Sequence, residues 1–158
     1  MIQRIQTIYL LLAACLMGMP LCMPLATITY GSEEIVLNAF NVSGLNEQLD
    51  TWLHVCLGVL LALPALLPFV TIFLFKNRLL QIRLCVSEIV LQLGSLVFIG
   101  IYCYRLCAAI TDKFPGVERH FMLGIAPFMP IVAIILVGLA IRGIAKDEAL
   151  VRSLDRIR

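Results

Sequence analysis

Four long apolar runs alternate with shorter polar segments along the chain. The runs cover residues 5–25, 52–75, 84–104 and 121–141. Each is long enough to cross the hydrocarbon core of a bilayer as a helix, which takes about 20 residues. None shows the strict apolar and polar alternation that is typical of a membrane barrel strand. Because backbone groups in lipid must be paired within their own segment, the pattern predicts an all-α membrane protein, a four-helix transmembrane bundle.

The connections between the runs predict smaller elements within the same single membrane domain, residues 1–158. The first connection, residues 26–51, holds two β-prone stretches at 27–30 and 35–37, separated by the turn-like residues 31–34. This arrangement predicts a small β-hairpin in the first outer loop. Prolines inside helices remove an amide donor, so the prolines at 64/68 and 127/130 predict kinks in the second and fourth helices.

The tail, residues 142–158, predicts an amphipathic cytoplasmic helix at the C-terminus. A narrow apolar stripe is formed by Val151, Leu154 and Ile157, and Arg152 and Arg156 lie one turn apart. Two interpretations stay open for this helix. It lies on anionic lipid at the membrane surface, or it docks on a cytosolic protein partner.

The composition supports a membrane location. Hydrophobic residues make up 61% of the chain and charged residues 14%, whereas a soluble domain has about 45–50% and about 25%. Lipid is therefore the expected surrounding of most of the molecule, and the lipid bilayer its first partner. The basic residues lack the interleaved aromatic residues of a strand-binding surface, so no nucleic acid partner is expected.

The distribution of charge predicts which way round the protein sits. No lysine or arginine occurs between Arg4 and Lys76, and the connection 26–51 carries only acidic charge. Basic residues instead gather at residues 76–83 and in the tail. Short loops rich in lysine and arginine stay in the cytoplasm, so both termini are predicted to be cytoplasmic. Four aromatic residues fall where the outer interfacial belt is expected: Tyr30, Trp52, Tyr102 and Tyr104.

Glu88 is the first candidate for chemistry, because it is an ionisable residue inside the third span. With Cys85, Gln92 and Ser95 it lies on one helical face, and Arg83 precedes it. An ionisable group within a membrane is costly and is by default a functional hypothesis, here a proton or ion relay. The alternative is a buried ion pair or hydrogen-bond cluster that ties helices together.

The expected surroundings of Glu88 follow from the predicted span. With the helix starting at residue 84, the carboxylate lies about one turn deep, roughly 5–8 Å, and can reach the headgroups. Arg83, Arg142, Gln6 and Tyr9 enter the membrane on the same side and are candidate partners for it.

The six cysteines lie in or beside apolar runs, where free cysteine packs as a small hydrophobe. A redox role compares with four-helix thiol oxidoreductases, but Cys103 and Cys107 have the wrong spacing for the C-x-x-C motif. A Cys22–Cys56 bridge between helices stays open. A weaker hypothesis is a copper(I) site formed by soft ligands near the outer side: Met17, Met19, Cys22, Met23 and His54. No phosphate loop, hydrolase triad or zinc signature occurs, so no catalytic residue, cofactor or metal is predicted.

The two ends of the chain carry a family resemblance. The first end is residues 1–13, MIQRIQTIYLLLA. The second is residues 146–153, KDEALVRS, with Asp155-Arg156-Ile157-Arg158 after it. Both ends resemble the uncharacterised four-helix membrane proteins of Bacteroidota-type bacteria grouped as DUF4293. The resemblance implies a bacterial inner membrane location and four spans, and it implies no activity and no catalytic residue.

Because both family-like ends are cytoplasmic in the predicted topology, they form a candidate cytoplasmic interaction surface. Its residues are Arg4, Gln6, Arg152 and Arg156. The sequence therefore predicts a non-enzymatic subunit or scaffold of a membrane complex, with a membrane or cytosolic protein partner. The alternatives are a small proton-coupled transporter that uses Glu88 and a membrane thiol or quinone redox protein.

Overall fold

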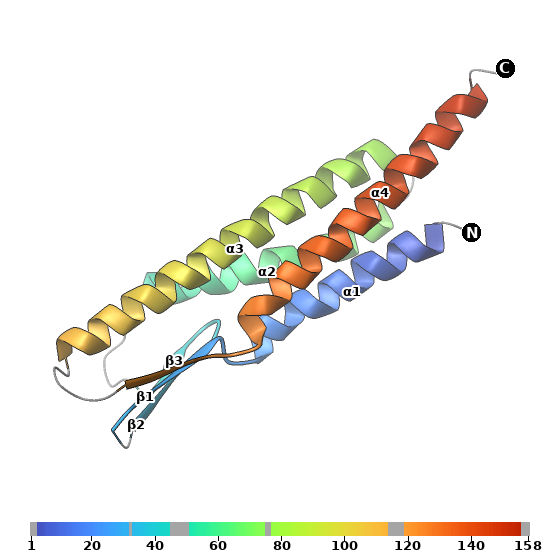
Figure 1. Ribbon diagram of the computed structural model, residues 1–158. Coiled ribbons are helices and arrows are strands. Elements are labelled where there is room, and N and C mark those ends of the chain that lie inside the picture. The colour runs from blue at the N-terminus through green and yellow to red at the C-terminus, as the bar shows by residue number, and fades with distance from the viewer. Residues whose placement is uncertain (1–2, 32, 45–50, 75–76, 114–118, 156–158) are drawn as a thin grey trace.

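Four long helices and a four-stranded sheet form the part of the chain that the computed structural model describes, residues 3–31, 33–44, 51–74, 77–113 and 119–155 (Figure 1). The helices are α1 (Gln3–Cys22), α2 (Thr51–Phe73), α3 (Arg78–Lys113) and α4 (Met129–Asp155), the last preceded by the short 3-10 helix η1 (Ala126–Phe128). The strands are β1 (Ala26–Tyr30), β2 (Glu33–Leu37), β3 (Val42–Ser43) and β4 (Arg119–Leu123).

The four helices pack as a closed bundle in sequence order. Each helix contacts the next along the chain, and α4 returns to contact α1. The sheet lies at one end of the bundle, which we call the sheet end (Figure 1). The first residues of α1 and the last residues of α4 lie at the opposite end, which we call the terminal end. All four helices are long and apolar enough to cross a membrane, which agrees with the four predicted spans.

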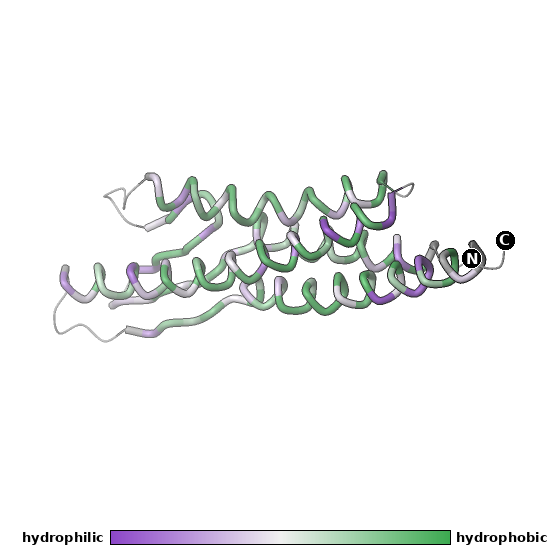
Figure 2. The backbone as a smooth tube through the Cα atoms, turned by 90° about the horizontal axis from the view of Figure 1, so that it is seen from above, coloured by the Kyte–Doolittle hydropathy of each residue, from purple (hydrophilic) through white to green (hydrophobic). Residues whose placement is uncertain are grey.

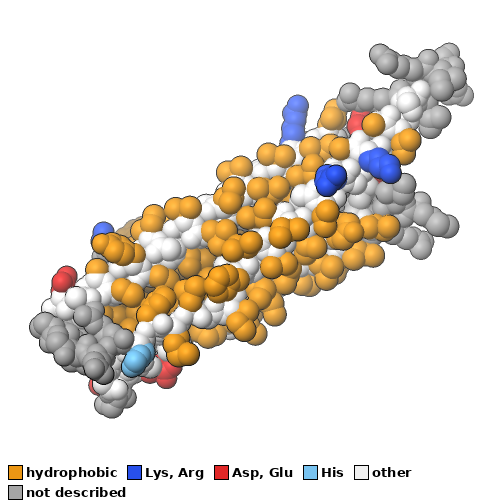
Figure 3. Space-filling view, viewed as in Figure 1, with side chains coloured by type: hydrophobic (Ala, Val, Ile, Leu, Met, Phe, Trp, Pro, Cys, Tyr) orange, Lys and Arg blue, Asp and Glu red, His pale blue; other side chains and the backbone are white. Residues whose placement is uncertain are grey.

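The helices are apolar on their outward faces as well as in the core. Figure 2 shows the apolar residues running along each helix with few polar interruptions. Large apolar side chains are exposed on every helix, for example Ile8, Val59, Val97 and Ile135. A helix that is apolar all round is typical of a membrane span. Figure 3 shows lysine and arginine side chains mostly toward the terminal end, with basic atoms also visible near the sheet end.

The predicted hairpin exists, but it is only part of a larger sheet. Strands β1 and β2 pair antiparallel from Ala26↔Leu37 to Tyr30↔Glu33, and Gly31, with φ of 58°, supplies the left-handed turn residue between them. The strand order is β3-β2-β1-β4, so β1 also pairs with β4, which comes from the connection between α3 and α4. The sheet thus joins two connections that are far apart in the sequence.

Two predicted span boundaries are wrong. The span 121–141 begins too early, because Phe121 to Leu123 belong to β4 and the helix α4 begins only at Met129. The span 84–104 is too short, because α3 covers 36 residues, about 54 Å at 1.5 Å per residue. That length exceeds the hydrocarbon thickness of about 30 Å.

The extra length of α3 gives the sheet a surface on which to pack. Buried residues from the last turns of α3, Leu106 and Ile110, belong to the same hydrophobic core as Ile28 and Ile35 of the sheet. Arg105 and Asp112 are exposed in these turns. Because they are charged, they interrupt the apolar run, and the span predicted from the sequence therefore ended at residue 104.

Two further expectations about helix shape are corrected. Pro127 lies in η1 and Pro130 is the second residue of α4, where a missing N–H costs no intrahelical bond. They start the fourth helix and do not kink it. The tail is helical as far as Asp155, but it continues α4 without a break at residue 142 (Figure 1). The amphipathic character of its last turn stays a prediction, because the side chain of Leu154 lies outside the described part.

Candidate functional site

The polar stripe predicted on the third span points into the bundle. Glu88, Gln92 and Ser95 follow one another at helical spacing on α3, and each has an exposed fraction of 0%. Cys85, one turn before Glu88, is equally buried. The stripe faces the core because a polar group that faces lipid lacks hydrogen-bond partners.

Within this stripe, Glu88 and Gln92 bond to each other and Ser95 bonds to the backbone. The amide Nε2 of Gln92 donates to Oε1 of Glu88 at 3.1 Å. The hydroxyl of Ser95 donates to the backbone oxygen of Gln92 at 2.7 Å. Among the residues that the structure describes, Oε2 of Glu88 and Oε1 of Gln92 are buried and have no hydrogen-bond partner. The site is therefore an acid–amide pair with one acceptor left over on each side chain.

The expected cationic partners do not reach Glu88. Arg83 and Arg142 are exposed, and Arg83 lies five residues from Glu88, which puts the two on different faces of a helix with 3.6 residues per turn. Glu88 lies ten residues past the first residue of α3, roughly 15 Å along the helix. The helix α3 starts six residues before the predicted span, and the prediction that Glu88 lies one turn deep in the membrane stays a prediction.

Gln6, another expected partner of Glu88, takes part in a different cluster at the terminal end. Its Nε2 donates to Oδ2 of Asp147 at 2.8 Å, and Arg78 donates from Nη1 to the backbone oxygen of Asp147 at 2.9 Å. Gly143 makes room for Gln6, since a Cβ there would lie 2.9 Å from Cγ of Gln6. The cluster ties α1 and α3 to α4, and sequence reasoning missed Asp147 because it was assigned to a separate tail.

The rest of the candidate cytoplasmic interaction surface stays a prediction. The side chains of Arg4, Arg152 and Arg156 lie outside the described part of the structure.

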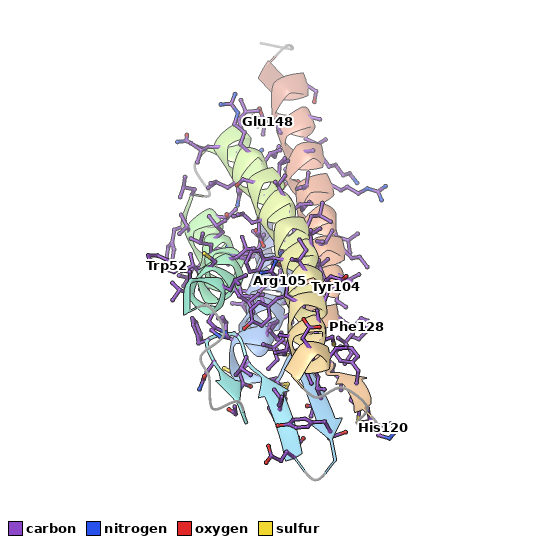
Figure 4. All side chains as sticks on the ribbon, turned by 90° about the vertical axis from the view of Figure 1, so that its left-hand side faces the viewer. Trp52, Tyr104, Arg105, His120, Phe128 and Glu148 are labelled. Atoms are coloured by element: carbon purple, nitrogen blue, oxygen red, sulfur yellow. The ribbon has the colours of Figure 1, made fainter. Side chains whose placement is uncertain are left out.

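A second buried polar pair joins α2 to α3 nearer the sheet end. The hydroxyl of Tyr102 lies 2.7 Å from Nδ1 of His54, and their rings meet edge to face with centroids 5.3 Å apart. The belt position expected for Tyr102 is therefore wrong, because its exposed fraction is 1%. Trp52 and Tyr104, exposed at 81% and 74%, fit the belt, and Figure 4 shows them at a similar level above the sheet.

Replacing Tyr102 with phenylalanine is expected to lower the free energy of unfolding by about 1 kcal/mol, because the buried His54 ring loses this partner. Unfolding in mixed micelles, followed by helix content, measures the change. The matched control is Tyr104→Phe, which removes an exposed hydroxyl and is expected to change nothing. Equal effects of the two substitutions would contradict the role of the buried pair.

The hairpin carries a polar contact of its own outside the helices. Tyr30 donates from its hydroxyl to Oε2 of Glu33 at 2.7 Å. This hydrogen bond to the carboxylate raises the pKa of Tyr30, since it favours the protonated phenol. The contact is thus present at neutral pH and is lost as the pH rises through the raised pKa.

The described residues are not arranged as the cysteine bridge or the copper(I) site would require. Cys22 and Cys56 are both free and exposed, so the bridge between them is not formed. Of the soft ligands, Met17 is buried in the core whereas Cys22 is exposed, and His54 bonds to Tyr102. Among the described residues, no three His, Cys, Asp or Glu side chains could hold a metal ion together.

The chain matches the model of a known protein family over almost its whole length. The model of the family described as "Domain of unknown function (DUF4293)" matches residues 2–157. No curated protein matches the chain.

Proposed function

The chain belongs to the DUF4293 family, a domain of unknown function, and from that premise we propose that it is a non-enzymatic subunit of a membrane complex, which binds another membrane protein through the free edge of its sheet. The proposed location is the bacterial inner membrane, with both termini in the cytoplasm. In support, nine of the twelve lysines and arginines lie in residues 1–4, 76–83 and 142–158.

The observation that carries the proposal is the apolar second half of the edge strand β4, Phe121 to Leu123, which follows Arg119 and His120. Strand β4 is the last strand in the order β3-β2-β1-β4, and its apolar side chains are exposed on both faces. Phe121 and Leu123 are 46% and 44% exposed, and Met122 on the opposite face is 67% exposed. Natural edge strands are usually charged, short or covered.

The backbone of β4 has donors directed away from the sheet. Gly124 donates its N–H to the backbone oxygen of Leu25 at 2.9 Å, and the N–H groups of an antiparallel strand alternate in direction. The N–H of Met122 therefore points toward β1, whereas those of Phe121 and Leu123 point to the open edge. These two groups can bond to a further strand.

Without a partner, neither lipid nor water is a favourable environment for the edge of β4. In lipid its outward backbone groups would lack hydrogen bonds, which costs several kcal/mol each. In water its exposed apolar side chains would remain solvated. An extended segment of a partner that pairs with β4 solves both problems at once, by β-strand addition.

A lysine in β4 is expected to release the partner. Met122→Lys places a charge on the edge, which natural sheets use to block further pairing. Glu34→Lys is the matched control, because it adds the same charge at an exposed position of the inner strand β2. We expect a stoichiometric companion to co-purify with the wild type and Glu34→Lys in mild detergent, and to be lost with Met122→Lys. Intact complexes are measured by native mass spectrometry.

Three other outcomes would overturn this function. Recovery of the bare monomer from the wild type would exclude a stable subunit. Equal companions for both lysine variants would place the interface elsewhere. A complex that contains only copies of this chain would replace the partner protein with self-association.

A second candidate, a small proton-coupled carrier, is favoured by the buried acid–amide pair of Glu88 and Gln92. Its first requirement is an ionisable group inside the bundle, away from both surfaces. Proteoliposomes with a pH gradient and an internal pH dye test it. A flux that Glu88→Gln abolishes would support the carrier, and an absence of flux in the wild type would count against it.

A further inference from the structure

The hydrogen bond between Glu88 and Gln92 leaves a complementary pair of atoms unused. A carboxylic acid and a primary amide can form a cyclic pair, in which the amide N–H donates to one acid oxygen and the acid O–H donates to the amide oxygen. The first of these bonds is present, from Nε2 of Gln92 to Oε1 of Glu88. The two oxygens without partners, Oε2 of Glu88 and Oε1 of Gln92, are the two atoms that the second bond would join.

An ionised Glu88 would leave both of these oxygens as acceptors with nothing to accept. Each unsatisfied buried acceptor destabilises the folded state, because it loses the hydrogen bond that water would give it. The negative charge would cost more, because a buried charge is tolerated only when it is paired. One proton on Oε2 removes the charge and supplies the donor that Oε1 of Gln92 lacks.

The helices around Glu88 bring no cation to it among the described residues. On α3 its titratable neighbour is the buried Cys85. On α1, Tyr9 is partly buried and the thiol of Cys15 is exposed. On α2, His54 is bonded to Tyr102.

The fourth helix adds no charge at this level either. From Met129 to Ile141 α4 has no titratable residue, and Arg142 after it is exposed.

We propose that Glu88 is a buried proton-binding site, in which the carboxyl group takes one proton from the aqueous phase and holds it between its Oε2 and Oε1 of Gln92. The proton adds to the carboxylate to give the neutral acid, and it returns to water on release. No other bond changes. This inference rests on the buried pair alone, so it is independent of partner binding at β4 and of any flux.

Infrared spectroscopy tests the site directly. We expect the purified protein in an ester-free detergent at pH 7 to show the C=O stretching band of a protonated carboxyl. The band is lost in Glu88→Gln and kept in the matched control Glu34→Gln. Exposed glutamates have pKa values of about 4 and are ionised at this pH. Gln92→Leu is expected to shift the band to higher frequency, because the acid carbonyl loses its amide donor.

A second measurement needs no substitution at Glu88, in case that variant fails to fold. Glutamate labelled with 13C at the side-chain carboxyl is expected to move the acid band of the wild type to lower frequency. Loss of carboxylate bands in Glu88→Gln, in place of the acid band, would overturn the proposal. So would an acid band that does not respond to the label, or one that Gln92→Leu leaves in place.

Discussion

Replacing Gln92 with leucine is expected to lower the free energy of unfolding of the bundle by about 1–3 kcal/mol. The leucine has similar bulk, so the loss comes from Glu88, whose carboxyl would then have no hydrogen-bond partner in the core. The present bond is 3.1 Å long, and both side chains have an exposed fraction of 0%. Reversible unfolding in mixed micelles of sodium dodecyl sulfate, followed by helix content, gives the free energy.

The double variant Glu88→Leu with Gln92→Leu is expected to recover most of this loss. Removing both polar partners leaves no unsatisfied group, and such replacements by apolar residues are often neutral. The coupling free energy from the four proteins of the cycle then measures the pair itself. Ser87→Ala is the control on the same helix, since its exposed hydroxyl bonds only to the backbone oxygen of Leu84. Additive effects of the two leucines would show that the pair does not act as a unit.

The second large effect is expected at Gly124, where the chain passes from β4 toward η1. A Cβ at this position would collide with the backbone oxygen of Pro24 and lie 3.1 Å from that of Leu25. Both are backbone atoms and cannot swing away as a side chain does. Gly124→Ala is therefore expected to cost about 1–3 kcal/mol, as overpacking does, and to weaken the bond from its N–H to Leu25.

Gly94→Ala is the matched control for Gly124→Ala. Gly94 lies inside α3, and no described atom outside its own stretch of helix lies within 4 Å of the added carbon. In a helix interior, alanine is favoured over glycine by up to about 1 kcal/mol, so this variant is expected to be neutral or more stable. Hydrogen exchange adds a local measurement, because the inward N–H of Met122 should lose protection in Gly124→Ala alone. Full protection of that group would show that β4 tolerates the added carbon.

The four spans could be predicted because a membrane helix is specified by a local property, the length of an apolar run. The strand β4 could not, since Phe121-Met122-Leu123 is apolar in the same way as the helix that follows. Its partner β1 lies more than ninety residues earlier in the chain, with Ala26 opposite Leu123. Only the three-dimensional return of α3 to the first connection distinguishes a strand from a helix there.

The candidate site was predictable in the same uneven way. The spacing of Glu88, Gln92 and Ser95 puts them on one face of any helix, so their common burial followed from the sequence. Which side chains meet from different helices depends on how each helix is rotated in the bundle. For that reason the pairs Gln6–Asp147 and His54–Tyr102 were missed, and the expected arginine partners of Glu88 were wrong.

The pairing of β1 with β4 also sets an order of events during synthesis. Strand β1 emerges after the first helix, whereas β4 emerges only after the third has been made, so the sheet stays incomplete until α3 has been inserted. A chain that stalls or inserts α3 the wrong way round leaves the second edge of β1 open, with Ile28 uncovered. Such an unpaired edge makes an incompletely folded chain prone to aggregation. Closure of the sheet therefore marks a chain whose membrane insertion has been completed in the right topology.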